Sequence, residues 1–213
     1  MTTRPADNLE PIALPAPVLG DGRTLLEALK MRCTSRDIGG EKIPLQALSD
    51  ILWAAQGVNR ATGPFGDPGR TAGSASNSRE IRVYVLMQEG TYLYEPEPHR
   101  LTPVAAGDIR RLAIGRGQQE AGAQAPARLV YVVDIERFQH SGFPEPGLYD
   151  PEIQKSYYFV DTGLVAQNVY LAAASVGLGA WFHNCDKEAF EQALGLGPDL
   201  RPVFGQTIGY ASE

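Results

Sequence analysis

Two arginines with a hydroxyl residue midway between them stand near the start of the chain, in the segment RCTSR at residues 32–36. A guanidinium group is always charged and can donate two parallel hydrogen bonds to a phosphate. If a helical turn continues through this segment, Arg32 and Arg36 share one face, because residues four apart are neighbours on a helix. The segment therefore predicts a phosphate anchor, to which Thr34 adds a donor. The alternative is a solvated basic helix end that complements the helix dipole.

Two later segments are rich in groups that bind ligands. Residues 73–78 read GSASNS and lie in a stretch without hydrophobic periodicity, residues 56–80. A loop of that length in a compact domain is usually functional or disordered. Residues 181–185 read WFHNC and follow a glycine-bounded turn. Neither segment holds a paired acid and base, which indicates that a cofactor carries the chemistry.

The other reactive residue types do not form a recognisable site. His183 and Cys185 are the closest pair of metal-ligating residues, and zinc normally needs three or four protein ligands, so we expect no metal. Cys33 lies between two arginines that would lower the pKa of its thiol; the alternative is a small filler on a helix face. Residues 115–120 (GRGQQE) lack the third glycine of a dinucleotide-binding loop.

The composition is that of an ordinary globular protein. The chain has 213 residues, of which 43% are hydrophobic and 21% charged, and its formal net charge is −6. This acidity argues against nucleic acid as the main partner. The two cysteines fit a reducing compartment, and the sequence shows neither a membrane-spanning apolar run nor a secretory signal. We therefore expect a cytoplasmic protein with no membrane partner.

The hydrophobic pattern predicts three main helices. The first opens with a capping box formed by Thr24 and Glu27 and would bury a stripe of leucines. The second starts at Pro44 and has apolar residues at helical spacing. The longest runs from Glu152 to Val176 and is apolar on most of its circumference, which predicts burial on nearly all sides. It suits a dimer axis, although burial within one domain explains it almost as well. The stripes are Leu25, Leu26 and Leu29 in the first helix, and Leu45, Leu48, Ile51, Leu52 and Ala55 in the second.

Alternating and β-branched residues predict the strands. Residues 81–87 and 91–94 form a hairpin, and the apolar run 129–133 is typical of the centre of a sheet that is covered on both faces. Shorter elements are expected as helices at 107–114 and 186–194 and as strands at 180–182 and 203–210. We therefore expect an α+β fold with a mixed or antiparallel central sheet flanked by helices.

The domain organisation is expected to be simple. Residues 1–23 contain four prolines, which predicts an extended arm. This arm would lie over a neighbouring subunit or form a loose tail. Residues 24–213 would form a single domain.

Across residues 25–210 the chain resembles the nitroreductase family of FMN-dependent oxidoreductases. It is similar in particular to the branch that includes the dehydrogenases of peptide thiazoline and oxazoline maturation, through LWAAQGVNR at 52–60 and RTAGSA at 70–75. The resemblance implies a nitroreductase-like fold and an obligate homodimer with two FMN sites at the subunit interface. It also implies a small-molecule substrate and NAD(P)H as the reductant.

Two family motifs define the implied flavin site. The Arg-x-Ser-x-Arg/Lys anchor is matched by Arg32, Thr34 and Arg36, which would hold the flavin phosphate, ribityl chain and ring edge. The Pro-Ser-x-x-Asn loop is matched from Gly73 to Asn77 and would reach the flavin of the partner subunit.

Two further matches complete the implied site. Asn168 corresponds to a polar position near the ribityl chain, and the backbone at His183 and Asn184 would approach flavin N5. The implied cofactor-binding residues are Arg32, Cys33, Thr34, Arg36, Ser74, Ala75, Asn77, Asn168, Trp181, His183 and Asn184.

The implied reaction is hydride transfer through flavin N5 in ping-pong order, with no catalytic side chain. It is either the NAD(P)H-linked reduction of a nitro or quinone acceptor or the oxidation of a small metabolite. Two departures from the family pattern are expected to weaken FMN binding. Gly73 replaces the proline of the loop, and residues 211–213 (ASE) lack the basic pair that many relatives carry after the last strand. A non-catalytic flavin-binding or scaffold subunit of the same fold is therefore the alternative.

Overall fold

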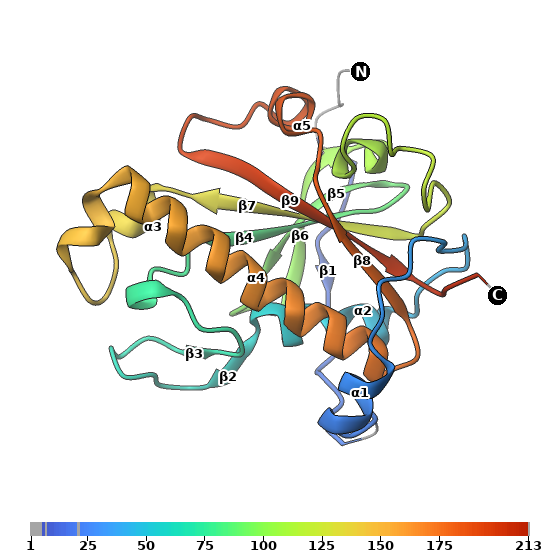
Figure 1. Ribbon diagram of the computed structural model, residues 1–213, viewed down its shortest axis with the longest axis horizontal. Coiled ribbons are helices and arrows are strands. Elements are labelled where there is room, and N and C mark those ends of the chain that lie inside the picture. The colour runs from blue at the N-terminus through green and yellow to red at the C-terminus, as the bar shows by residue number, and fades with distance from the viewer. Residues whose placement is uncertain (1–5, 7, 21, 213) are drawn as a thin grey trace.

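The computed structural model describes residues 6, 8–20 and 22–212 and is built on a seven-stranded sheet (Figure 1). The strand order is β1-β6-β5-β4-β7-β9-β8, and every pairing is antiparallel. This confirms the predicted α+β class. A separate ribbon pairs β2 with β3. The strands are β1 (Ile12–Ala13), β2 (Val58–Arg60), β3 (Gly69–Arg70), β4 (Ile81–Leu86), β5 (Gly90–Glu95), β6 (Arg100–Ala106), β7 (Ala127–Asp134), β8 (Gly179–His183) and β9 (Leu200–Gly209).

Helices cover both faces of the sheet. α2 and α4 pack on one face, and α4 runs across it in Figure 1, whereas α5 packs on the other. The helices are α1 (Leu25–Met31), α2 (Leu45–Gln56), α3 (Glu136–Gln139), α4 (Pro151–Ser175) and α5 (Lys187–Leu194), with short 3₁₀ turns at Ala75–Asn77, Arg110–Ala113 and Pro146–Tyr149.

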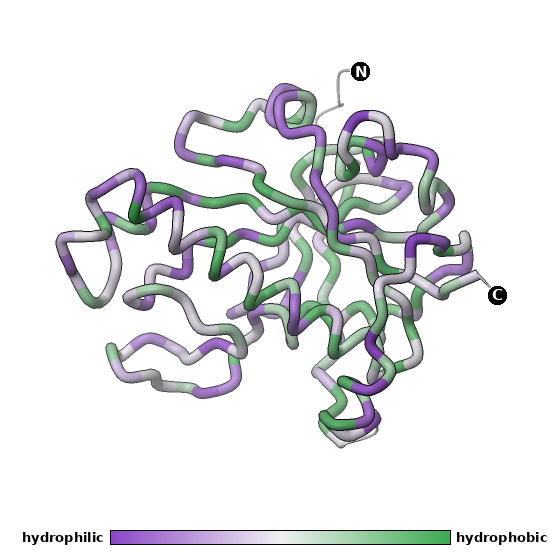
Figure 2. The backbone as a smooth tube through the Cα atoms, viewed as in Figure 1, coloured by the Kyte–Doolittle hydropathy of each residue, from purple (hydrophilic) through white to green (hydrophobic). Residues whose placement is uncertain are grey.

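β7 lies in the middle of the sheet, and all eight of its residues are buried. Leu129 and Tyr131 contribute to the core under α4, and Val130 and Val132 to the smaller core under α5. Successive side chains of a strand point to opposite faces, so a strand covered on both sides is expected to be apolar along its centre, as residues 129–133 are. Figure 2 accordingly shows hydrophobic colour along much of this strand. The prediction of a central strand is confirmed.

The first helix differs from its prediction in what it buries. The capping box is present, because the Thr24 hydroxyl accepts from the Glu27 N–H and the Glu27 carboxylate accepts from the Thr24 N–H. α1 has only seven residues, however, and Ala28 is its one buried side chain. The predicted stripe was therefore wrong for this helix and for the first residue of α2: the exposed residues are Leu25, Leu26, Leu29 and Leu45.

The longest helix has the predicted extent but not the predicted burial. α4 has 25 residues, begins at Pro151 and is capped by the Asp150 side chain. Its residues toward the sheet are buried, but Val160 is 62% exposed and Leu164 is 46% exposed. The expectation of burial on nearly all sides was therefore wrong for the single chain. Since residues four apart share a helix face, these two side chains form an exposed apolar stripe.

The N-terminal arm packs against its own chain over the part that is well placed. β1 pairs with β6, and Leu14 is buried. The Ser49 hydroxyl donates to the Pro15 carbonyl, and the Gln46 amide donates to the Ala16 carbonyl, at 2.5 and 2.9 Å. Residues 12–16 are therefore not a loose tail, and an arm over a neighbouring subunit stays a prediction. Residues 1–5, 7 and 21 of the predicted arm lie outside the described part.

Two segments have more structure than was expected. Residues 56–80 contain the β2–β3 ribbon and the 3₁₀ turn at Ala75–Asn77, instead of one loop. β6 was not predicted, because its sequence RLTPVAA carries a proline and alternates only weakly. Pairing with β5 and β1 on its two sides provides the hydrogen bonds that its own pattern does not indicate.

Candidate functional site

The segment from Arg32 to Arg36 is extended, so the helical argument for the anchor was wrong. α1 ends at Met31, and Arg32 is already non-helical, with ψ at 119°. Thr34 forms a parallel bridge with Ala180 of β8, and the Ser35 N–H donates to the Ala180 carbonyl at 2.9 Å. The hydrogen bonds that this segment forms at the edge of the sheet take the place of those that a further helical turn would provide.

The two arginines of this segment lie over aromatic rings. The Arg32 Cζ atom is 5.4 Å from the centroid of the Tyr170 ring on α4, and the Arg36 Cζ atom is 5.9 Å from that of Trp181 on β8. The Thr34 hydroxyl is 3.3 Å from the Tyr170 hydroxyl. An aromatic ring can hold a guanidinium group in place while the guanidinium N–H donors stay free for another partner. The structure thus brings Arg32, Thr34, Arg36 and Trp181 to one region beside β8.

These guanidinium groups are electrostatically unmatched. Within the described part of the chain, neither Arg32 nor Arg36 has a carboxylate oxygen within 4.0 Å. Cys33 and Thr34 are exposed. Arg36 is exposed and Arg32 is half-buried. A cationic group that is oriented by a ring and has no acidic neighbour is suited to binding an anion. This donor set fits the phosphate of a nucleotide cofactor.

His183 is a buried, neutral hydrogen-bonding group. Its Nδ1 donates to the Asn184 carbonyl at 3.0 Å, and its Nε2 accepts from the Thr207 hydroxyl at 2.8 Å. Burial lowers the pKa of His183 to about 4, and its ring lies 4.6 Å from the Trp181 ring. With both nitrogens engaged, His183 fixes the turn after β8 and does not serve as a base. Asn184 is exposed, and its carbonyl also accepts from the Gly115 N–H.

The loop that carries Ser74, Ala75 and Asn77 lies at the other half of α4. The Ala75 N–H donates to Asp161 Oδ2 at 2.8 Å, the Ser74 hydroxyl accepts from the Arg79 N–H, and Asn77 Oδ1 accepts from Arg79 Nε. Asn77 has a positive φ of 58°, a conformation that asparagine tolerates better than most residues. The loop is therefore held in a defined shape by α4 and by Arg79.

The two halves of the predicted site are separated along α4. Asp161 beneath the loop and Tyr170 beneath Arg32 are nine residues apart, which is about 13 Å along a helix and about half a turn around it. Asn168 is two residues from Tyr170 along the helix but points to the same side as Asp161, and its amide donates to the Ala54 carbonyl of α2 at 2.9 Å. Within one chain, Ser74, Ala75, Asn77 and Asn168 are thus not gathered around the arginine pair.

A buried pair of carboxyl groups beneath the loop was missed by the sequence analysis. Glu80 is completely buried, and its Oε2 accepts from the Ser78 hydroxyl at 2.6 Å. Burial and the nearby Asp161 carboxylate raise the pKa of Glu80 to about 8. Burial also raises the pKa of Asp161, but the Ala75 N–H opposes that rise. The pair therefore holds one proton at neutral pH, on Glu80. No pattern around a single glutamate indicates such burial.

No cluster of three or more histidine, cysteine or acidic residues within the described chain is arranged to hold a metal ion. Among the described helices, none is both long enough and apolar enough to cross a membrane.

Comparison with known proteins identifies the family. A sequence model of the nitroreductase family matches residues 29–210, most of the chain. The antiparallel sheet with a long helix across it agrees with the nitroreductase-family structures to which this chain is similar. The chain belongs to the nitroreductase family.

Two relatives that are more than 30% identical to this chain support this assignment. The protein MJ1384 of Methanocaldococcus jannaschii, whose name places it among the nitroreductases, is 31% identical over 166 residues, which are 73% of this chain and 75% of that protein. A nitroreductase-like protein from Ralstonia eutropha JMP134 has a crystal structure that is 32% identical, with a TM-score of 0.85, over 100% of this chain and 96% of that one.

A more distant structure shares the fold alone. It is the microcin synthetase McbBCD complex of E. coli with truncated pro-MccB17 bound, and one of its chains is 19% identical with a TM-score of 0.70. The match covers 97% of this chain and 80% of that one.

We predict that Glu80→Gln flattens the dependence of stability on pH. In the folded protein, Glu80 keeps its proton up to about pH 8. In the unfolded chain, the same carboxyl group loses the proton near the usual glutamate pKa of 4.5. The free energy of unfolding of the native protein should therefore fall as pH rises through this window, by about 1–3 kcal/mol from this group. Glutamine accepts the Ser78 hydrogen bond but has no proton to lose.

Urea unfolding at a series of pH values measures this effect. The matched control is Glu136→Gln, an exposed glutamate that should leave the pH profile unchanged. Parallel profiles for native protein and Glu80→Gln would show that the Glu80 proton does not contribute.

Proposed function

We propose that this protein is a homodimeric FMN-dependent oxidoreductase with a flavin site at each end of the subunit interface. Family membership supports oxidoreductase activity in general. The observation that carries the finer proposal is the pair of guanidinium groups, Arg32 and Arg36, that are held over aromatic rings without a carboxylate nearby.

The residues of the anchor have defined roles in this proposal. Arg32 and Arg36 hold the FMN phosphate or the ring edge, and Thr34 donates to the ribityl chain. When bound, FMN supplies hydride transfer at N5, from a reductant such as NAD(P)H to a nitro or quinone acceptor, or from a small metabolite. A guanidinium beside the flavin stabilises negative charge on its reduced ring. His183 is neutral and internally bonded, so it orients the turn and adds no charge.

The exposed apolar surface supports a dimer. Val160 and Leu164 lie on a side of α4 between the side that carries Asp161 and the side that carries Tyr170, as the helical angles require. A second chain that covers this stripe would bury it and bring its own loop at residues 73–77 toward Arg32. Two separated half-sites in one chain then become two complete sites in the pair.

The activity has a direct test. Purified protein should absorb as a flavoprotein, lose that absorbance when NADH or NADPH is added without oxygen, and regain it with a quinone or nitroaromatic acceptor. A protein that binds FMN but is not reduced by either nucleotide would exclude the NAD(P)H-linked reaction and leave either oxidation of a small metabolite or the non-catalytic alternative. A colourless protein that ignores added FMN would contradict the proposal and favour a scaffold subunit of the same fold.

We predict that Arg32→Ala lowers FMN affinity by about tenfold or more, since a hydrogen bond to a charged group contributes about 1.5–3 kcal/mol. The fold should persist, because cationic groups at the surface add little stability. Flavin content after gel filtration and the thermal unfolding midpoint measure the two effects. Arg111→Ala, an exposed arginine elsewhere, is the matched control and should retain FMN.

A mixed dimer tests whether the site is shared. We predict that Arg32→Ala and Asn77→Ala homodimers both lose FMN, whereas a heterodimer of the two chains binds one FMN per dimer. In the heterodimer, one site receives both changes and the other receives neither. Differently tagged chains, co-expressed and purified in tandem, allow this flavin-to-protein ratio to be measured. A heterodimer as empty as its parents would place both residues in the same subunit's site.

A further inference from the structure

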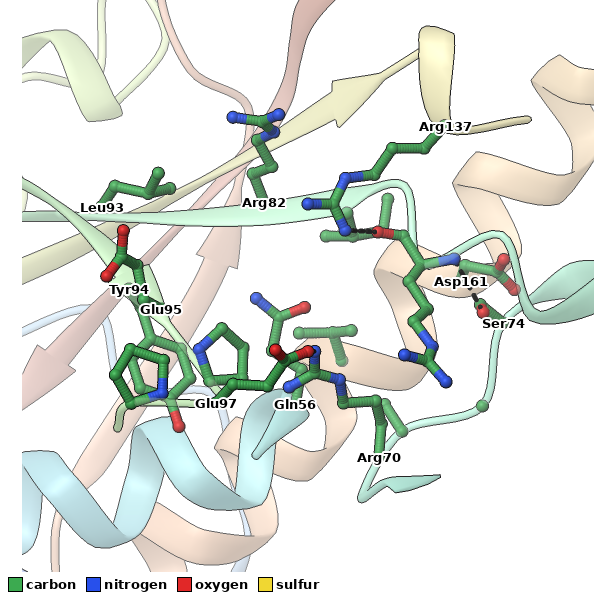
Figure 3. Close-up of a pocket in the computed structure, with 17 residues that line it drawn as sticks. Gln56, Arg70, Ser74, Arg82, Leu93, Tyr94, Glu95, Glu97, Arg137 and Asp161 are labelled. Atoms are coloured by element: carbon green, nitrogen blue, oxygen red, sulfur yellow. Dashed lines mark hydrogen bonds and ion pairs between the residues drawn. The ribbon is translucent and has the colours of Figure 1, made fainter. Parts of the chain in front are cut away.

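A cavity of about 440 Å³ opens beside the loop at residues 73–79, and none of the anchor residues 32–36 lines it. Its walls come from β3, β4, β5, the turn after β5, α3 and α4. Figure 3 shows Arg70, Arg82 and Arg137 around this space, each from a different element, with Glu97 beside Arg70. Arg79 lines the cavity as well.

The arginines of this cavity outnumber the carboxylates that pair with them. Arg82 and Arg137 share Asp134, the second at 3.4 Å. Among the carboxylates of the described residues, Arg79 pairs with Asp67 alone, at 3.7 Å. Of the three acids in the lining, Glu97 pairs with Arg70, Glu95 pairs with Arg100, and Asp161 accepts from the Ala75 N–H. Four guanidinium groups therefore share three carboxylates.

Arg70 is the least satisfied of these groups. Its side chain is 13% exposed, Nη2 donates to Glu97 at 2.8 Å, and Nη1 is buried without a hydrogen-bond partner among the described residues. Burial lowers the pKa of Arg70, Glu97 opposes this, and Arg79 and Arg137 lower the pKa further. An unpaired donor among like charges is costly in free energy, and a bound anion would remove that cost.

Part of the remaining wall is apolar or aromatic, beside the polar side chains of Gln56 and Ser74. Ile81, Leu93, Tyr94 and Val165 line it, together with two prolines after β5. A cavity of a few hundred Å³ with an apolar wall and a few convergent polar groups is typical of a small-molecule site. The wall favours a ligand with an apolar or ring-shaped body, and the arginines favour an oxyanion on it.

We propose that this cavity binds a small organic anion, with its carboxylate or phosphate group held by Arg70 and Arg137 and its apolar body against Leu93 and Val165. The site is distinct from the flavin anchor, because it lies at the Asp161 end of α4. Ser74 is the one predicted flavin-contacting residue in its lining. Binding does not require FMN.

Isothermal titration with four probes tests the proposal on the protein as purified and on protein saturated with FMN. The probes are benzoate, phenyl phosphate, inorganic phosphate and the neutral benzyl alcohol. We expect benzoate or phenyl phosphate to bind, and benzyl alcohol not to bind, up to about 10 mM. A preference for one of the first two distinguishes a carboxylate ligand from a phosphate ester, and inorganic phosphate reports how much of the binding comes from the anion alone.

The variants Arg70→Gln and Arg137→Gln should each weaken binding of the better probe by about tenfold. Arg137 is 45% exposed, so its loss should not affect folding. Arg110→Gln is the matched control: Arg110 is 16% exposed, also pairs with one carboxylate, and lies elsewhere. Its variant should bind the probe normally.

Three results would overturn the proposal. They are no binding of either aromatic anion, equal binding by Arg70→Gln, Arg137→Gln and native protein, and competition between the probe and FMN. The last would make the cavity part of the flavin site. Retention of probe binding in Arg32→Ala, whatever its FMN content, separates failure of this proposal from failure of the flavin assignment.

Discussion

Burial of one side of α4 against the sheet is the packing interaction on which the rest of the structure depends. Val165 and Val169 belong to the core that also contains the inward side chains of β7. The same helix carries Tyr170 beneath Arg32 and Asp161 beneath the loop at residues 73–77. A straight helix fixes the distance between these supports, so the chain cannot bring them together by local rearrangement. The separation between the arginine anchor and the loop at residues 73–77 is thus a consequence of helix geometry.

Features that depend on residues close together in the sequence were predicted correctly, and features that depend on contacts between distant residues were not. The capping box at Thr24 and the apolar run in β7 are determined by neighbouring residues and were predicted correctly. The conformation after Met31 was predicted wrongly, because a bridge to Ala180, far along the chain, ends the helix. The leucines of α1 were assigned to a core because periodicity identifies an apolar face but not what covers it.

The candidate site shows the same limit. Residue types at 32–36 indicated an anion anchor, and the chosen arginines do lie without acidic partners, although their rings, Tyr170 and Trp181, come from distant elements. No sequence pattern pointed to Glu80 or Arg70. Glu80 is distinguished by its burial, and Arg70 by an Nη1 atom without a hydrogen-bond partner among the described residues, and both features arise only when the chain folds. A chain with a net charge of −6 can still gather four arginines around one cavity.

The carboxyl pair beneath the loop links these regions. Asp161 uses its charge to accept the Ala75 N–H, and this hydrogen bond fixes the start of the 3₁₀ turn that carries Asn77. A second negative charge on Glu80 would compete for the same environment, so the proton on Glu80 helps to keep Asp161 ionised. The loop that we expect at one subunit's flavin is therefore positioned by a buried acid pair, one member of which, Asp161, also lines the arginine-rich cavity.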